Sequence, residues 1–196
     1  MKNLFSLLVL SGLLVMFGCS ANSTANNSSN GTKTDAAKTD KKDEKKAETG
    51  PDGKTDLTME KFMKMELDMS YQQVKDIMTV EGKELTKDRS YSWHGENSAS
   101  VNANFKDGKL ESKFQGQLGP TKGTNEISMD TVDKIKTGMS YEAVKKLLGF
   151  EGELESANKE DSSTNLKYRW RNADFGSVAV DFLDNKVAQK NVVNIK

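Results

Sequence analysis

The chain has 196 residues, and its 29 Lys and Arg side chains balance 29 Asp and Glu side chains. A zero formal net charge gives no reason to expect nucleic acid or an anionic surface as a partner. The chain has a single cysteine, which excludes an internal disulfide. It also has a single histidine, and these two residues are too few for a Cys/His metal cluster. We therefore expect neither a metal nor a cofactor.

The first residues have the form of an export signal. Lys2 precedes an apolar run, Leu4 to Phe17, which is too short to span a membrane as a helix. The run ends at Gly18-Cys19, and a small residue directly before a cysteine resembles the lipobox of bacterial lipoproteins. That resemblance implies that residues 1–18 are removed and that the Cys19 thiol carries diacylglycerol, a membrane anchor. The alternative is an incidental, buried thiol.

A polar segment follows the cysteine. Residues 20–56 contain no Val, Ile, Leu, Met or aromatic residue, so residues 19–56 are predicted to form a disordered tether. As a flexible coil this tether reaches roughly 30–35 Å, enough to lift a domain clear of the lipid headgroups. Its Lys-, Asn- and Ser-rich composition resembles that of Gram-positive lipoproteins. We therefore expect a lipid-anchored protein on the extracytoplasmic face of the cell membrane.

From Leu57 onward the sequence is a tandem repeat. Segments of the first copy return 70 residues later: Met69-Ser-Tyr-Gln-Gln-Val-Lys75 as Met139-Ser-Tyr-Glu-Ala-Val-Lys145, and Glu81-Gly82 as Glu151-Gly152. Later segments return after 77 residues, as Tyr91-Ser-Trp93 does at Tyr168-Arg-Trp170. The jump in offset predicts one insertion in the second copy, between Gly152 and Tyr168. The predicted boundaries are 57–118 for repeat 1, 119–126 for a linker and 127–196 for repeat 2.

Each copy is predicted to begin with two short helices. Thr58 is a candidate N-cap for the first helix, and Ser70 with Gln73 has the spacing of a capping box for the second. The helices place apolar residues at helical spacing: Met59, Phe62, Met63, Met65, Tyr71, Val74, Ile77 and Met78. We interpret these positions as core rather than as a methionine-rich binding surface.

The apolar period then changes to two, which predicts about four antiparallel strands per copy. Alternation places Trp93 and Trp170 on the helix-covered face; the alternative is a ligand-stacking pair on the other face. Asp107-Gly108 predicts a hairpin turn, after which Leu110, Ser112 and Phe114 are expected to share a face. The open face is expected to carry Ser92, His94, Asn102, Asn104, Arg169, Arg171, Ser177, Ala179 and Asp181.

These elements predict an α+β fold. Each copy is small for an independent core, and joining two sheets edge to edge removes one exposed edge from each. We therefore expect one continuous sheet of about eight antiparallel strands, with the helices on one face.

A family resemblance supports this architecture. The tandem of two helices and four strands, with Gly138-Met-Ser-Tyr-Glu-Ala-Val-Lys145 opening a helix and Tyr168-Arg-Trp170 on a later strand, resembles the beta-lactamase inhibitory protein (BLIP) family. It is also similar to SmpA/OmlA-type lipoproteins, which use a single such unit. The resemblance covers Leu57 to Lys196. It implies that the concave sheet face and the loops after the aromatic strands grip an enzyme, with one acidic and one aromatic residue entering its active site.

The resemblance assigns a set of partner-binding residues. The corresponding loops here are 95–98 and 171–176, so Glu96, Asp174 and Phe175 match the acidic and aromatic positions. His94, Arg169 and Arg171 on the open face complete the predicted set. Phe175 is either an exposed anchor beside Asp174 and Arg171 or a side chain folded back over the sheet edge.

Three functions fit the sequence. The first is a monomeric, non-enzymatic module that binds an envelope or extracellular protein, as an inhibitor or regulator of a cell-wall-active enzyme. The second is a structural lipoprotein for envelope assembly. The third is a hydrolase using His94, although no Gly-x-Ser-x-Gly elbow is present and the recurring Glu81 and Glu151 fit a local turn role.

The lipid anchor is directly testable. Cys19→Ser removes the only thiol that could carry the acyl group, so we expect this variant to leave the membrane fraction or to keep its signal sequence. Membrane fractionation and intact mass measurement check both outcomes. Unchanged fractionation together with unchanged mass would contradict lipidation.

Overall fold

The computed structural model describes residues 55–196, so the predictions for the signal sequence, for Cys19 and for nearly all of the tether lie outside the described residues. No helix among the described residues is long and apolar enough to cross a membrane. In chain order the elements are α1 (Met59–Lys64), α2 (Tyr71–Met78), β1 (Lys83–Thr86), β2 (Ser90–His94), η1 (Glu96–Ser98), β3 (Ser100–Lys106), β4 (Lys109–Gly116), α3 (Met129–Val132), α4 (Tyr141–Leu148), β5 (Glu153–Glu160), β6 (Ser163–Arg171), β7 (Ser177–Leu183) and β8 (Lys186–Val193).

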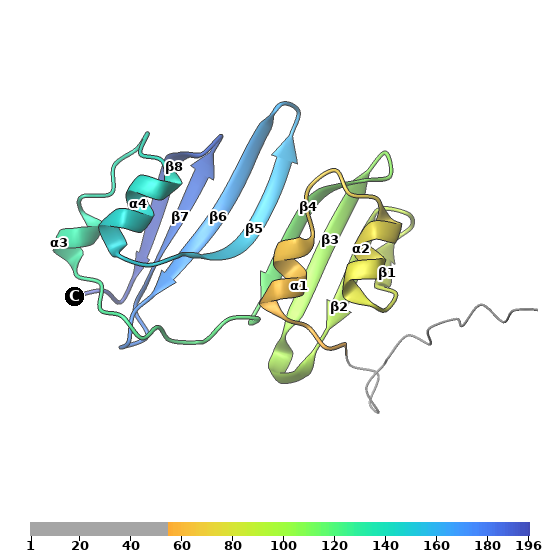
Figure 1. Ribbon diagram of the computed structural model, residues 1–196, viewed down its shortest axis with the longest axis horizontal. Coiled ribbons are helices and arrows are strands. Elements are labelled where there is room, and N and C mark those ends of the chain that lie inside the picture. The colour runs from red at the N-terminus through yellow and green to blue at the C-terminus, as the bar shows by residue number, and fades with distance from the viewer. Residues whose placement is uncertain (1–54) are drawn as a thin grey trace, which may run out of the picture. The chain divides into compact units, whose positions relative to one another are not determined.

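The strands form one antiparallel sheet in sequential order, β1 to β8, and all four α-helices cover the same face (Figure 1). This confirms the predicted fold class. Each repeat has its own core between its helices and its four strands. The largest buried side chains are Phe62, Met65, Met78 and Trp93 in repeat 1, and Ile135, Trp170 and Phe182 in repeat 2.

The predicted helix caps are present. Thr58 accepts a hydrogen bond from the backbone of Lys61, and Ser70 forms the capping box with Gln73. Met63, predicted near the core, is instead 47% exposed, because Phe62 is the one side chain that the six-residue α1 buries.

Each tryptophan packs directly against a glycine of its own repeat. A Cβ at Gly82 would lie 2.7 Å from the Trp93 ring, and one at Gly152 would lie 2.6 Å from the Trp170 ring. Both indole N–H groups donate inward, to Val80 O at 3.2 Å and Phe150 O at 2.9 Å. The prediction of buried tryptophans on the helix-covered face is confirmed, and the recurring glycines are explained by this contact.

The expected alternation along β4 is wrong. The pairing with β3 shifts between Asn104 and Phe105, so Glu111 is an extra residue that reverses the facing of everything after it. Leu110 is buried as expected, but Phe114 is 50% exposed on the open face and Lys113 is buried on the helix side. A bulge of this kind leaves no mark in the apolar pattern that would reveal it.

In both repeats a lysine from the sheet donates hydrogen bonds to carbonyl groups at the end of the first helix. Lys113 Nζ donates to Phe62 O at 2.8 Å and lies 4.4 Å from the Phe62 ring centroid. Its equivalent, Lys190, donates to Val132 O at 2.6 Å and to Ile135 O at 3.2 Å. The ammonium groups thus give an additional donor to carbonyls at the ends of the short helices; Phe62 O and Val132 O also accept from the backbone N–H groups of Met65 and Ile135.

The insertion in repeat 2 joins the two halves of the sheet. It lengthens the β5–β6 hairpin, and β5 uses this added length to pair Ser156, Ala157 and Asn158 with β4. Lys159 then forms an ion pair with Asp68 at 2.6 Å. In repeat 1 the equivalent strand, β1, stops at Thr86 and has no such extension.

The C-cap of α2 offers a stability test. Thr79 holds a left-handed conformation (φ 66°) where the second repeat has Gly149 (φ 85°). A β-branched residue is strained there, so we expect Thr79→Gly to raise the free energy of unfolding by about 0.5–1 kcal/mol. Urea denaturation measures the change. Gly149→Thr is the matched control and should lower stability; equal values for wild type and Thr79→Gly would contradict the strain.

The buried lysine predicts a pH dependence. Burial lowers the pKa of Lys113 from 10.5 to about 8. Between these values the unfolded chain keeps a proton that the folded chain has released, so stability should rise with pH across this window. Relative to Lys113→Met, we expect the wild type to gain roughly 1–3 kcal/mol between pH 7.5 and pH 10. Urea denaturation at both pH values, with the exposed Lys109→Met as control, tests this; a pH-independent difference would refute it.

Candidate functional site

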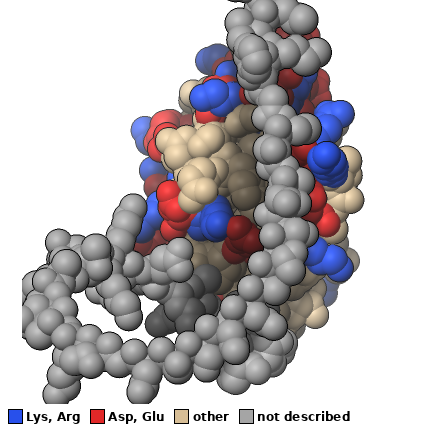
Figure 2. All heavy atoms as spheres, turned by 90° about the vertical axis from the view of Figure 1, so that its right-hand side faces the viewer, with Lys and Arg blue, Asp and Glu red and all other residues tan. Residues whose placement is uncertain are grey.

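The sheet face opposite the helices, called the open face below, carries no helix of the described residues (Figure 1). One row across it reads Lys83, Ser92, Asn102, Phe114, Ser156, Lys167, Asp181 and Gln189. Phe114 therefore lies on a central strand between polar neighbours. Figure 2, seen from the right-hand side of Figure 1, looks onto the β1 edge of the sheet, where the visible Lys and Arg are interspersed with Asp and Glu.

The open face is less uniformly exposed than the alternation predicts. Ser92, Ser177 and Ala179 are buried, because small side chains lie between longer neighbours on adjacent strands. Ser92 Oγ has no hydrogen-bond partner among the described residues. His94 and Asn104 are exposed, as expected.

Two arginines and two glutamates form a partly buried cluster where β5 begins and β6 ends. We call Glu153, Glu155, Arg169 and Arg171 the ion cluster. The Arg169 guanidinium binds Glu155 with two nitrogens, Nε to Oε1 and Nη2 to Oε2 (3.0 Å), and donates to Ser177 Oγ at 3.0 Å. Arg171 lies 3.4 Å from Glu153 and 3.8 Å from Glu155. Hydrogen bonding to Glu155 raises the pKa of Arg169. The four charges cancel, and bidentate pairing fixes their directions.

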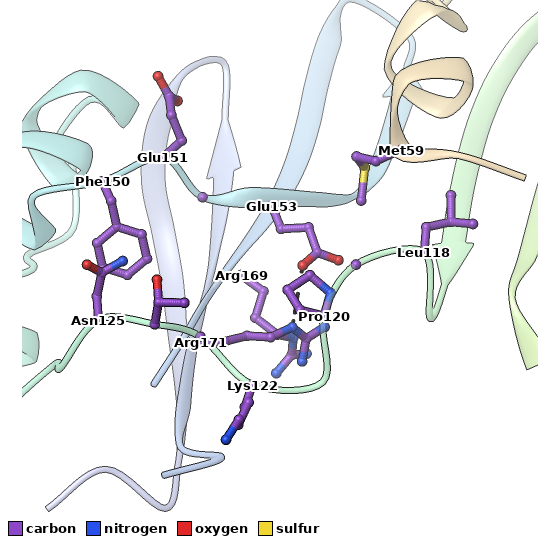
Figure 3. A pocket seen from close by; sticks show the side chains of 14 residues that line it. Met59, Leu118, Pro120, Lys122, Asn125, Phe150, Glu151, Glu153, Arg169 and Arg171 are labelled. Atoms are coloured by element: carbon purple, nitrogen blue, oxygen red, sulfur yellow. Dashed lines mark hydrogen bonds and ion pairs between the residues drawn. The ribbon is translucent and has the colours of Figure 1, made fainter. Parts of the chain in front are cut away.

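The linker between the repeats packs against this cluster. In Figure 3 the side chains of Arg169, Arg171 and Glu153 point toward Pro120 of the linker. These residues line a cavity of about 490 Å³. Gly119 and Gly123 allow the close approach, because a Cβ would overlap the Glu153 carboxylate at the first and the Arg171 carbonyl at the second. Apolar walls come from Met59, Leu118 and Phe150.

Asn172 fixes the linker to the end of β6. Its side chain accepts from Ile127 N at 2.7 Å and donates to Ile127 O at 3.3 Å. Its backbone N–H donates to Gly176 O at 2.6 Å, closing the β6–β7 loop. The Asn172 side chain thus holds the residue that follows the linker, while its backbone holds Gly123 of the linker and the loop that carries Phe175.

The two predicted loops lie at the same end of the sheet. Both follow even-numbered strands of a sequential antiparallel sheet, β2 and β6, so both emerge at one rim. Glu96 and Asp174 are exposed there. Four strand spacings separate the loops, or roughly 19 Å. The structure therefore places the two loops along one rim, without direct contact between them.

Phe175 is displayed at this rim. It is 64% exposed, in a left-handed conformation (φ 67°) that is unusual for an aromatic residue. A hydrogen bond from its N–H to Asn172 O (3.3 Å) and one from Gly176 N to Asp174 Oδ1 (3.1 Å) hold the loop. Lys122 Nζ lies 5.6 Å from its ring centroid. Of the two alternatives for Phe175, exposure is the one observed.

The described residues contain no group of three or more His, Cys, Asp and Glu side chains arranged to hold a metal. Within residues 55–196, no hydrogen bond joins the His94 imidazole to a serine or a carboxylate. The recurring glutamates have a local role: Glu81 pairs with Lys75 and Glu151 with Lys145, each at 2.5 Å.

Comparison with known proteins decides the family. The family model described as "Beta-lactamase inhibitor (BLIP)" matches residues 58–170 and 128–196. The chain belongs to the BLIP family. A BLIP domain is a protein-binding, inhibitor-like module, and its members are inhibitors rather than enzymes.

The BLIP fold is also found by structural comparison. A crystal structure from Streptococcus mutans, provisionally described as a beta-lactamase inhibitor protein, superposes with a TM-score of 0.55 and 17% identity. The match covers 73% of this chain and 100% of that one, and at this identity it establishes the fold alone. Among curated proteins, no sequence matches the chain.

Proposed function

We propose that this protein is a lipid-anchored, extracytoplasmic BLIP-family module that inhibits or regulates an envelope enzyme by binding it across the open face. The observation that carries the proposal is the combination of an uncovered sheet face with two exposed phenylalanines, Phe114 on a central strand and Phe175 at the rim. Family membership gives the class of activity. The signal-like N-terminus and Cys19 supply the proposed location.

Interface energetics favour these two side chains as anchors. Binding energy concentrates in a few aromatic or arginine residues surrounded by polar contacts. Phe114 is flanked by Asn102 and Ser156, and Phe175 by Asp174 and by Lys122, whose Nζ lies 5.6 Å from its ring centroid. The charges of the ion cluster are already paired within the chain, and the pairing fixes the directions of its hydrogen bonds. A partner that covered the cluster would therefore bury no unpaired charge and would pay no large desolvation penalty. A rim of roughly 19 Å fits a standard interface of about 800 Å² per partner.

The strained backbone at Phe175 supports the same role. Keeping a bulky residue at positive φ costs on the order of 1–3 kcal/mol, and such strain is concentrated at binding and active sites. Three hydrogen bonds within residues 172–176 maintain the conformation. A loop that only connected two strands would gain stability from glycine at this position.

The anchors can be tested against a matched control. The full chain is cross-linked in intact cells, purified and analysed for a stoichiometric partner, whose affinity is then measured for variants. We expect Phe114→Ala and Phe175→Ala each to weaken binding at least about tenfold. Met63→Ala is the control: it removes an apolar side chain about as exposed as Phe114 from the helix side, and should leave the affinity unchanged. Equal loss in all three variants, or in none, contradicts the proposal.

Direct addition to a beta-lactamase assay separates the target classes. We expect no strong inhibition, because Glu96 stands in the first loop where the inhibitors carry an aspartate. Strong inhibition that Phe175→Ala abolishes would make a beta-lactamase the target. A captured partner without enzymatic activity, retained by both phenylalanine variants, would favour the envelope-assembly role instead.

A further inference from the structure

The edge strand β8 occupies the position in repeat 2 that β4 occupies in repeat 1. The 77-residue offset equates Ser112, Lys113 and Phe114 of β4 with Gln189, Lys190 and Asn191 of β8. Both strands carry a bulge at the same point, with register shifts at Asn104/Phe105 and Asp181/Phe182. The two strands therefore present the same backbone on their outer sides.

The first part of this outer side is covered in the same way in both repeats. In repeat 1, Asp68 N donates to Leu110 O at 2.9 Å and Leu110 N to Met69 O at 2.7 Å. In repeat 2, Gly138 N donates to Val187 O at 2.9 Å and Val187 N to Met139 O at 2.8 Å. The turn before the second helix thus closes the start of both strands.

The next part is occupied in one repeat and free in the other. Ser112–Phe114 pair with β5, whereas β8 is the last strand of the sheet, and none of residues 55–196 pairs with its outer side at Gln189–Asn191. Lys113 is buried and Lys190 is only half-buried, although both make the same contact with their helix. Repeat 1 therefore shows what fits on β8: an antiparallel strand with a small residue, like Ala157, opposite the lysine.

The usual protections of an edge strand are weak here. Lysines on edge strands commonly discourage pairing, but the Lys190 ammonium is turned under α3 to Val132 O, and Lys186 lies at the covered start. No proline interrupts β8. The exposed stretch Gln189–Val193 thus has N–H and C=O groups on its outer side that no strand within residues 55–196 pairs with. No charged side chain of that range lies over these groups.

A second copy of this chain does not fit the edge well. Its β1 is the equivalent of β5, but β1 ends at Thr86, the counterpart of Ser156, where pairing would begin. Pairing of β8 with β8 around a twofold axis at Lys190 would put a second lysine, rather than a small residue, opposite Lys190. The short β1 prevents copies from joining head to tail into an open array.

We propose that the free edge of β8, Gln189–Val193, binds an extended segment of a partner protein as a ninth, antiparallel strand. Main-chain hydrogen bonds would supply the affinity. Specificity would require a small residue opposite Lys190, with uncharged polar residues opposite Gln189 and Asn191 on the open face. This second interface is independent of the open-face anchors.

The strand that fills the equivalent edge is the natural probe. A synthetic peptide of residues 153–160 carries a single cysteine, placed either by Asn158→Cys or by Ser156→Cys. The full chain carries Cys19→Ser, which removes its only thiol, with either Gln189→Cys or Asn191→Cys. The predicted register pairs 189 with 158 and 191 with 156, and these matched pairs should form disulfides at least about tenfold faster than the mismatched pairs.

Three further measurements complete the test. Hydrogen exchange should show peptide protection confined to the amides of Gln189–Val193, and Ala157→Arg in the peptide should abolish it. Phe114→Ala should leave cross-linking unchanged, which separates this proposal from the open-face one. Equal rates for matched and mismatched pairs, or protection elsewhere, would overturn the proposal.

Two outcomes would name a different occupant. Disulfide-linked dimers of the Gln189→Cys chain, formed faster than the peptide adduct, would make a second copy the occupant. Register-specific cross-linking that appears only after residues 20–50 are deleted would make the chain's own N-terminal segment the occupant. Either result contradicts a separate partner protein.

Discussion

The pairing of three residues of β4 with three of β5 makes one sheet out of two repeats. Each repeat alone has four strands and two short helices, a size at which a single core gives little stability. The joint is short because the turn at Asp68–Ser70 already covers the start of β4. Around it, the Asp68–Lys159 ion pair, the Gln115–Glu153 hydrogen bond (2.7 Å) and the linker held by Asn172 all act between the repeats. The continuity of the open face depends on this small region.

Much of the fold follows from local sequence signals. Caps at Thr58 and Ser70, the Asp107-Gly108 turn and the buried tryptophans were predictable because each depends on neighbouring residues or on simple alternation. The facing of Phe114 was not, because a bulge at Glu111 is decided by pairing with β3. A lysine that serves as a core residue is equally invisible in a hydropathy pattern, although its recurrence as Lys190 was a usable signal.

The candidate site was predictable only in part. Arg169 and Arg171 alternate with Trp170, which placed them on the open face, but their partners Glu153 and Glu155 come from another strand, β5. Asn172 and the linker glycines serve contacts across more than 30 positions of sequence, which no local pattern encodes. The exposed state of Phe175 depends on hydrogen bonds inside its loop.

Comparison of the two repeats separates stability from binding. Residues that recur, such as the tryptophans, their glycines and the buried lysines, all belong to the helix-covered side. On the open face the copies have diverged: Glu153, Arg169 and Arg171 stand where repeat 1 has Lys83, Ser92 and His94. Selection for the fold alone would leave both halves of that face free to drift. An ordered ion cluster in one half and an exposed Phe114 at the central joint instead give the face two chemically distinct regions, and in the proposed complex these would favour one orientation of the bound protein.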